Sequence, residues 1–422
     1  MLPAQATAVT PHTITTPTGQ EKAVGDALAG GPTLPDELTS LQKCILGSQG
    51  LILDAVNLVK IMDDVFERSV PEASLRTPDD LDTLSRPEKY ESLAEVIRKL
   101  DIYFLASLIH RDEQGMIVER WDATAQKEAI ENLSYAAKEQ LRSALEPFKL
   151  ADKQPLEFTD QTTLIFPGAA IPRMQLRAEF AIAQNSDKKS PGLLICNGSS
   201  RPLVAIDHLK DSDQDKNLYK NIEDLVEKLN DDLGPTATEA HAQMALMDML
   251  RTDDEDCFLN KQPIYVVHTG GVKYYPQSLL ENGEYTLNYY QENSGRPNTE
   301  ATMVSAFKAL EQLPGTMPEE IVLVSNQPHI HSQQIATERV VAKNHGHAPM
   351  TIRACGEKTS LESTTDLFLA IDSVRKSIQL LNPDYHVTTN WVEEPEWKLF
   401  ESKSPGEWQL YKPGQPPVEQ LI

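Results

Sequence analysis

A short run of uniformly apolar, β-favouring residues, IVLVS at 321–325, lies between two segments with helical patterns. Strands that are apolar at every position are typical of parallel sheets covered on both faces. The preceding helix is predicted to begin at Asn298 or Thr299, because Pro297 disfavours helix just before it and both side chains can cap a helix. The loop 326–329 follows the strand at its carboxyl end, where open α/β sheets bind ligands. This segment therefore predicts an α/β core with functional positions at one edge.

Apolar runs and helical patterns alternate through most of the chain. Further strands are predicted at 162–166, 192–196, 264–268 and 350–354, and helices at 90–110, 124–145, 173–183, 235–250 and 360–381. An acidic stretch at 211–232 is interpreted as one solvated helix, and 274–290 as an inserted hairpin with Asn282 and Gly283 in its turn. Such a succession predicts a Rossmann-like α/β fold, a parallel sheet with helices on both faces.

Changes of pattern divide the chain into four parts. Residues 1–34 are rich in Thr, Ala, Pro and Gly without periodicity, which predicts disorder. An N-terminal helical domain is predicted over 35–150 and the α/β domain over 156–381. The Pro- and Trp-rich C-terminal tail, 382–422, is expected to pack its aromatic rings along the α/β domain, with a partner-binding segment as the alternative.

Charge, cysteine usage and hydropathy restrict the class of protein. A formal net charge of −24 argues against nucleic acid or an anionic membrane surface as a partner, because both attract basic proteins. The 4 cysteines are scattered without a CxxC pair, as is typical of a reduced, cytoplasmic protein without disulfides or a zinc knuckle. No signal-peptide pattern is present, and no apolar run approaches the ~18 residues of a membrane span. We expect a cytoplasmic protein, with export into a host cell without a cleavable signal peptide as the alternative.

Loops at the ends of the predicted strands are the candidate binding positions. The sequence contains no Walker loop, GxGxxG, GxSxG or HExxH motif. The loops 167–170, 197–200 and 325–329 hold small or polar residues, and their free N–H groups beside helix starts favour an anion. The alternative is that they are ordinary turns. The candidate ligand-binding residues are Gly168, Ala169, Arg177, Asn197, Gly198, Ser199, Asn298, Thr299 and His329.

Two carboxylates stand near predicted helix starts. Glu239 and Glu300 are the candidate catalytic residues, as a general acid/base pair or as groups that orient a sugar hydroxyl. The alternative needs no function, because an acidic residue in a first helical turn gains about 0.3–1 kcal/mol from the helix dipole. Histidines form two HxH pairs, at 329–331 and 345–347, but no carboxylate spacing accompanies them, so no metal site is predicted.

The order of the strand-end motifs resembles the YdcF/SanA-like family, over roughly 156–381. The motifs are the PGAA loop 167–170 followed by Arg177, the NGSS loop 197–200, Thr238-Glu239-Ala240, Asn298-Thr299-Glu300 and the segment 324–329. Ser332 stands where the family usually carries an arginine. The resemblance implies a Rossmann-like domain that binds a ligand at the strand ends, and leaves a nucleotide, S-adenosylmethionine or a lipid-linked phosphate open as that ligand.

Two functions of different class follow from these observations. The first is a bacterial protein that binds a small anionic or nucleotide-like molecule at the carboxyl edge of the sheet, with hydrolase or transferase activity left open. The alternative is a protein-interaction module or translocated effector with a vestigial pocket. An acidic run at 393–396, the added helical domain and the absence of glycine-rich loops motivate this alternative, in which the helical domain or the tail binds a protein partner.

Overall fold

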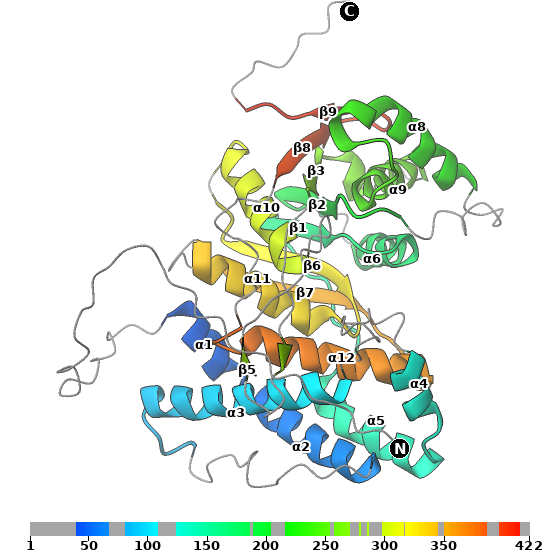
Figure 1. Cartoon of the computed structure of the whole chain (residues 1–422). Helices are drawn as coiled ribbons and strands as arrows, with labels where there is room; N and C mark the ends of the chain where they lie inside the picture. Colours follow the sequence, from blue (N-terminus) through cyan, green and yellow to red (C-terminus); the bar gives the residue numbers. More distant parts are fainter. Residues whose placement is uncertain are drawn as a thin grey trace, which may run out of the picture. The chain divides into compact units, whose positions relative to one another are not determined.

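The computed structural model describes most of the chain (Figure 1). The described residues are 39–66, 81–108, 124–185, 189–203, 216–253, 257–270, 278–279, 285–286, 298–315, 317–344, 350–385 and 396–413. The disorder expected at 1–34, the turn at Asn282 and Gly283, the histidine pair 345–347 and residues 393–395 of the acidic run 393–396 lie outside the described residues, whereas Glu396 is described and exposed.

One seven-stranded sheet organises the α/β part of the molecule. Its strands, in spatial order, are β7 (Thr351–Glu357), β6 (Glu320–Asn326), β1 (Thr162–Pro167), β2 (Leu193–Ser199), β3 (Ile264–Thr269), β8 (Trp397–Ser402) and β9 (Trp408–Leu410). The first five are parallel to one another, and β8 and β9 continue the sheet in antiparallel orientation. The predicted Rossmann-like α/β fold is thereby confirmed.

Helices cover both faces of the sheet (Figure 1). One face carries α6 (Ile171–Gln184), α8 (Lys216–Leu233) and α9 (Glu239–Asp253), and the other carries α10 (Thr299–Gln312) and α11 (Ile330–Asn344). From β1 the chain proceeds outward through β2 and β3, then returns through α10 to β6 on the other side of β1. Loops leaving β1 and β6 at their carboxyl ends therefore go to helices on opposite faces, which creates a topological switch point between these strands.

The two sheet faces explain why consecutive residues in the middle of the central strands are apolar. Leu164 and Val322 pack into the cluster under α6 and α9, whereas Ile165 and Leu323, one residue further along, pack into the cluster under α10. All six residues of β1 are buried. Uniform burial of this kind is what a parallel strand between two helix layers requires.

The sequence predicted one solvated helix over 211–232. Helix α8 instead has one buried face and one solvated face. It begins at Lys216 and buries one apolar stripe against the cluster beneath it, namely Leu218, Ile222, Leu225, Leu229 and Leu233. These residues recur at three- and four-residue intervals, which places them on one helix face. The acidic residues occupy the remaining surface, so the charge pattern hid a second, apolar pattern.

The N-terminal helices pack on the layer of α11 and of α12 (Thr364–Leu381). They are α1 (Ser40–Gly47), α2 (Gln49–Val65), α3 (Arg86–Leu108), α4 (Thr124–Glu131) and α5 (Tyr135–Leu145), followed by a 3-10 turn at Glu146–Phe148; a second 3-10 turn, Phe258–Asn260, lies between α9 and β3. The helix predicted over 124–145 is broken, because the Ser134 side chain accepts from Ala137 N at 3.1 Å and caps a new helix.

Residues Thr39–Ile422 form one compact unit. No single described helix is long and apolar enough to cross a membrane; α1 and α2 meet that test only together, bent by 61°.

The C-terminal segment forms two strands, which the sequence did not predict. β8 pairs with β3 and β9 pairs with β8. Trp408, 3% exposed, donates from Nε1 to Asp248 Oδ2 at 2.7 Å and so fastens β9 to α9.

The predicted hairpin within 274–290 is confirmed by the antiparallel pairing of β4 (Ser278–Leu279) with β5 (Tyr285–Thr286).

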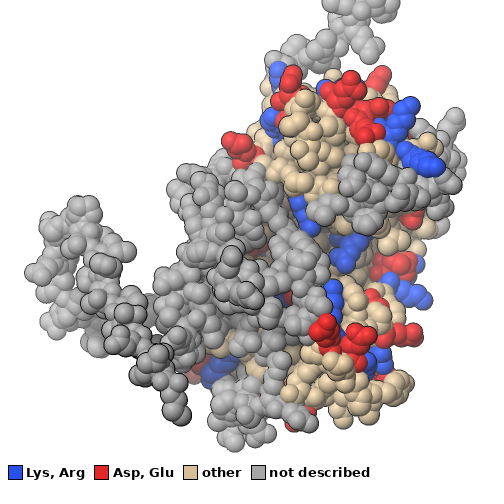
Figure 2. All heavy atoms as spheres, turned by 45° about the vertical axis from the view of Figure 1, so that its right-hand side comes forward, with Lys and Arg blue, Asp and Glu red and all other residues tan. Residues whose placement is uncertain are grey.

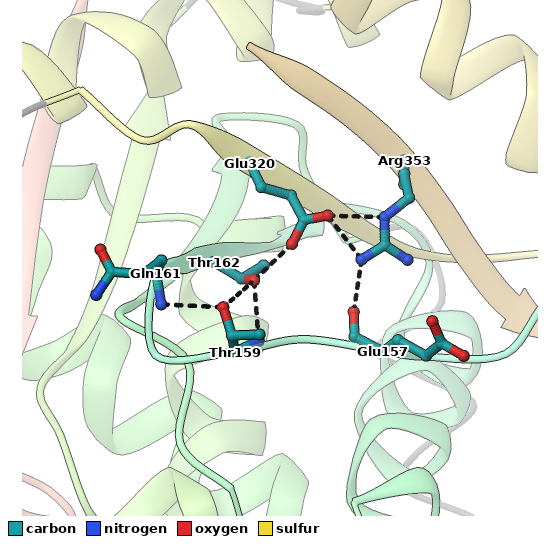
Figure 3. A network of polar contacts seen from close by, with 6 residues as sticks. All are labelled: Glu157, Thr159, Gln161, Thr162, Glu320 and Arg353. Atoms are coloured by element: carbon teal, nitrogen blue, oxygen red, sulfur yellow. Dashed lines mark hydrogen bonds and ion pairs between the residues drawn. The ribbon is translucent and has the colours of Figure 1, made fainter.

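The amino edge of the sheet is closed by an ion-paired network (Figure 3). Glu320, at the start of β6, accepts from Thr162 Oγ1 at 2.7 Å and from Arg353 Nε at 2.9 Å. Arg353 also donates to Glu157 O at 2.9 Å. This network ties β1, β6 and β7 together at their amino ends with its groups satisfied, whereas several buried groups at the carboxyl edge are not.

Candidate functional site

The loop after β1 brings three predicted residues together. Gly168 N donates to Asn197 O at 2.9 Å, which joins the ends of β1 and β2. A Cβ at Gly168 would lie 2.7 Å from Oε2 of Glu239 in the first turn of α9. Glycine thus allows Glu239 to approach the β1 backbone closely. Ala169, beside it, is partly buried against the core.

Arg177 of α6 spans the switch point between β1 and β6. Its side chain, 2% exposed, donates from Nη1 to Pro167 O at 2.6 Å and from Nε to Asn326 Oδ1 at 3.0 Å. Burial, and secondly the charge of Arg173, lower the pKa of Arg177 to about 9, while the charge of Glu239 opposes the shift, so Arg177 is still a cation at neutral pH. Nη2 donates to none of the residues that the structure describes. Arg177 therefore presents a desolvated positive charge whose hydrogen-bond partners are uncharged oxygens.

Arg251, near the end of α9, is a buried arginine with a structural role and offers a comparison. It is 3% exposed, and all three guanidinium nitrogens have partners. Nε donates to Leu259 O, Nη1 to Ser402 Oγ, and Nη2 to Gln262 O and Ser402 O, at 2.8–3.2 Å. These partners lie at the amino end of β3, away from the carboxyl edge. Arg177 differs because one of its nitrogens is left for another acceptor.

A second cation and a histidine extend the site. Arg173 precedes Arg177 by four residues on α6, so the two side chains lie on the same side of the helix. Arg173 Nη1 lies 3.0 Å from Nε2 of His329, which is buried in the loop after β6. His329 N donates to Asn326 O at 2.9 Å. Helix α6 therefore carries two arginines to the β6 loop from the opposite face of the sheet.

Glu239 is held by two neighbours. Ser199 Oγ, at the end of β2, donates to its Oε2 at 2.7 Å, and Arg201 Nη1 pairs with Oε1 at 3.3 Å. Both carboxylate oxygens are therefore engaged, and the side chain is fixed in orientation. Of the two predicted carboxylates, Glu239 is the one that lies with Gly168 and Ser199.

The two residues before Ser199 have different surroundings. Asn197 is wholly buried; its Nδ2 lies 3.6 Å from Met303 Sδ, and its Oδ1 has no hydrogen-bond partner among the described residues. A Cβ at Gly198 would lie 2.7 Å from the Cα of Ala240, so Gly198 is the point where α9 packs onto β2. Gly198 therefore has a packing role on the α9 face, while Asn197 lies on the α10 face.

The start of α10 contributes a cap and an ion pair. Asn298 accepts from Ala301 N at 2.8 Å, and it rather than Thr299 caps the helix; both are partly buried. Glu300 pairs with Arg339 of α11 at 3.3 Å. Burial raises the pKa of Glu300, while Arg339 opposes that shift. Glu300 thus belongs to an ion pair between α10 and α11, and its described partners do not include the residues around Glu239.

Several site residues escaped the sequence analysis. Arg173 and Arg201 join the site through contacts between segments far apart in the chain, and so does Asn326, which was predicted only as part of the loop 325–329. The sequence contains one indication for Arg173, because this residue precedes Arg177 by about one helical turn and so lies on the same side of the predicted helix. In the described part of the chain, no group of three or more His, Cys, Asp or Glu side chains is arranged to hold a metal ion.

Comparison of the chain with protein-family models, with curated proteins and with solved structures finds no match. The chemistry of the site is therefore interpreted from its own geometry. That geometry is a buried arginine at the switch point, with a second arginine, a histidine and a fixed carboxylate around it.

Proposed function

We propose that this protein binds a small phosphate-bearing molecule at the carboxyl edge of its sheet, between β1 and β6. The observation that carries the proposal is the environment of Arg177. Its cation is buried, its described partners are uncharged oxygens, and Nη2 has no described partner. Burying a charge is costly unless it is paired, so an anion at this position stabilises the folded protein. Guanidinium groups recognise phosphate and carboxylate oxygens through two parallel N–H donors.

The surrounding residues favour phosphate over a simple carboxylate. Arg173 and His329 meet at 3.0 Å beside the β6 loop, and the loops after β1 and β6 lead directly into the amino ends of α6 and α11. Several donors around one point suit the several oxygens of a phosphate. Arg173 also supplies a cation from α6 in the part of the fold where the resembled family has an arginine and this chain has Ser332.

Figure 2 shows Lys and Arg side chains near the middle of one face, with acidic side chains beside, above and below them. Nucleotides, S-adenosylmethionine and sugar phosphates are the ligands to compare, because they differ in charge and in whether they carry a phosphate.

Glu239 is the group that would assist a reaction, as a hydrolase or a transferase. It lies against Gly168 and is oriented by Ser199 and Arg201, so it borders the phosphate position. A carboxylate placed there can accept a proton from an attacking hydroxyl or water. Phosphate release from a bound nucleotide, abolished by Glu239→Gln while binding persists, would distinguish an enzyme from a binding protein.

A thermal-shift and calorimetric series tests the proposal. Inorganic phosphate, AMP, glucose 6-phosphate, S-adenosylmethionine and uncharged adenosine are titrated into the protein. At ten times the dissociation constant a ligand stabilises by about 1.4 kcal/mol, which raises the melting temperature of a protein of this size by roughly 2 °C. We expect phosphate compounds to stabilise the protein and adenosine not to.

Two variants at the proposed site and one control elsewhere distinguish the loss of anion binding from the general effect of removing a buried arginine. Arg177→Met should remove the stabilisation by phosphate compounds, and the more exposed Arg173→Gln should weaken it if Arg177→Met does not fold. Arg251→Met is the matched control, because it removes a buried arginine at the other edge of the sheet. It should lower the melting temperature and keep the ligand-induced shift. No stabilisation by any anion, or equal shifts in Arg177→Met and wild type, would contradict the proposal.

A further inference from the structure

Three of the buried polar groups without partners lie on one face of the carboxyl edge. Ser325 Oγ, Asn197 Oδ1 and Thr269 Oγ1 have no hydrogen-bond partner among the described residues. Their side chains are only 0–1% exposed. Native proteins satisfy most buried polar groups with protein, water or ligand, so such a group calls for an explanation. The amino edge of the same sheet shows the contrast, because Glu320 and Thr162 there are paired.

The strand register places these three side chains on the face covered by α10. Side chains alternate along a strand, and Leu323, Ile195 and Val267 belong to the cluster under α10. Ser325, Asn197 and Thr269 each follow one of them by two residues and therefore point to the same face. Asn197 confirms this direction, because its amide lies 3.6 Å from Met303 of α10.

The register also places two of the three groups, those of Ser325 and Asn197, beside the proposed phosphate position, while Thr269 is level with Ser199 on the next strand outward. Pro167 is paired with Asn197, and two residues earlier Ile165 is paired with Leu323, so Ser325 and Asn197 flank Pro167. Strands lie about 4.8 Å apart, which separates the two flanking backbones by about 10 Å. The carbonyl of Pro167 is the acceptor of Arg177 Nη1. The unpaired groups of Ser325 and Asn197 on the α10 face and the arginine on the α6 face therefore approach the last residue of β1 from opposite faces of the sheet.

The chemistry of the recess suits hydroxyl groups. Serine and threonine hydroxyls donate and accept, and the asparagine amide presents a polar atom in either of its orientations. A ligand hydroxyl, which also donates and accepts, can pair with any of the three. A charged oxygen gains less here, because no cation lies among these three residues.

We propose that Ser325, Asn197 and Thr269 form a hydroxyl recess, and that the ligand is a phosphate ester of a polyhydroxylated molecule, such as a sugar phosphate or the ribose phosphate of a nucleotide. This inference rests on the proposed function, because Arg177 holds the phosphate while the recess binds the hydroxyls across the edge of the sheet. A site built to hydrogen-bond hydroxyls discriminates strongly against analogues that lack them.

Calorimetric titrations with ribose 5-phosphate and with inorganic phosphate test the recess through the ratio of their affinities. Wild type should bind ribose 5-phosphate at least ten-fold more tightly than phosphate. Ser325→Ala should reduce this ratio several-fold, and Thr269→Val, which removes a hydroxyl while keeping the side-chain shape, should act in the same direction if Ser325→Ala does not fold. Ser377→Ala is the matched control, since its buried hydroxyl donates to Ser373 O at 2.9 Å in α12, and it should keep the wild-type ratio.

The outcomes separate this inference from the function on which it rests. If phosphate binds through Arg177 but ribose 5-phosphate binds no more tightly, the hydroxyl recess is overturned and the anion site stands. An unchanged ratio in both Ser325→Ala and Thr269→Val also overturns it. If neither compound binds to wild type, the proposed function fails and the recess fails with it.

Discussion

Arg177 shows how a single residue can carry a functional argument. Its guanidinium is as buried as that of Arg251, and the two differ in what surrounds them. Arg251 uses all of its nitrogens for structure, whereas Arg177 bridges Pro167 and Asn326 and retains Nη2. A buried cation that is not fully used by the fold is a strong indication of an anionic ligand.

Two buried histidines make a prediction about acid stability. Burial lowers the pKa of His241 to about 4, and burial and then the neighbouring His241 lower that of His268 to about 4. In the unfolded chain both take up protons below about pH 6.5, whereas the folded protein keeps them neutral until about pH 4. Their stabilising contribution is therefore present above pH 6.5 and is lost as the pH falls toward 4. By pH 5 the loss is ~2 kcal/mol per histidine.

His268→Asn should remove one histidine's share of this pH dependence. Urea unfolding at pH 7 and at pH 5 would measure the free energy of unfolding of wild type and variant at both values. The variant should lose about 2 kcal/mol less than wild type over this interval. The loss in the variant is compared with the loss in wild type, because Asp101 contributes to the pH dependence of both proteins. Burial raises the pKa of Asp101 to about 6, so its contribution to stability changes with pH in the opposite direction. Equal losses would show that His268 is not responsible.

At the scale of elements, the packing of α9 on β2 depends on Gly198. We predict that Gly198→Ala lowers the free energy of unfolding by about 1–3 kcal/mol, because a Cβ there would lie 2.7 Å from the Cα of Ala240 and the backbones must separate. Gly50→Ala in α2 is the control, because nothing lies within 4 Å of its Cβ position. That change should be neutral or should stabilise by up to about 1 kcal/mol. Chemical denaturation of both variants checks the pair, and equal effects would contradict this account of Gly198.

The elements also show what local patterns could predict. The strands of the parallel sheet were found because burial on both faces makes consecutive positions apolar, as at 164–166 in β1 and 321–324 in β6. β8 and β9 were missed, since β8 carries polar residues at Lys398, Glu401 and Ser402, and β9 is only three residues long. The break between α4 and α5 escaped notice because the cap at Ser134 interrupts an otherwise continuous helical pattern.

Of the candidate site, the sequence predicted the loops at the strand ends but not the contacts between them. Gly168, Arg177 and Ser199 follow strands whose ends were recognised, and the structure brings all three to one edge. The contact of Arg177 with Asn326 depends on β6 lying beside β1, and no local pattern encodes that strand order. Glu300 illustrates the opposite case, because its position at a helix start suggested catalysis while its partner Arg339 lies on a neighbouring helix.

At the scale of the molecule, the C-terminal segment completes the sheet. β8 covers the edge of β3, and Leu399, Phe400 and Trp408 are buried in the core clusters. Removing this segment would leave β3 as an exposed apolar edge, which favours aggregation. The described part of the tail, 396–413, is therefore part of the fold.

Trp408→Ala tests this role. We expect a loss of about 3–5 kcal/mol in the free energy of unfolding, because the change removes a large buried side chain and its hydrogen bond to Asp248. Trp408→Phe keeps most of the volume and loses the hydrogen bond, so it should cost less. Urea denaturation followed by circular dichroism gives both values. A midpoint for Trp408→Ala equal to that of wild type would mean that β9 contributes little to the fold.

The most direct test of the anion site is the position of a tetrahedral anion in a crystal. Tungstate resembles phosphate in shape and charge, and its anomalous scattering locates it without reference to any assumed ligand. The account predicts an anomalous peak within hydrogen-bonding distance of the Arg177 guanidinium, between the carboxyl ends of β1 and β6. A crystal soaked in tungstate that shows no peak there, or shows its strongest peak elsewhere, would contradict the proposed function.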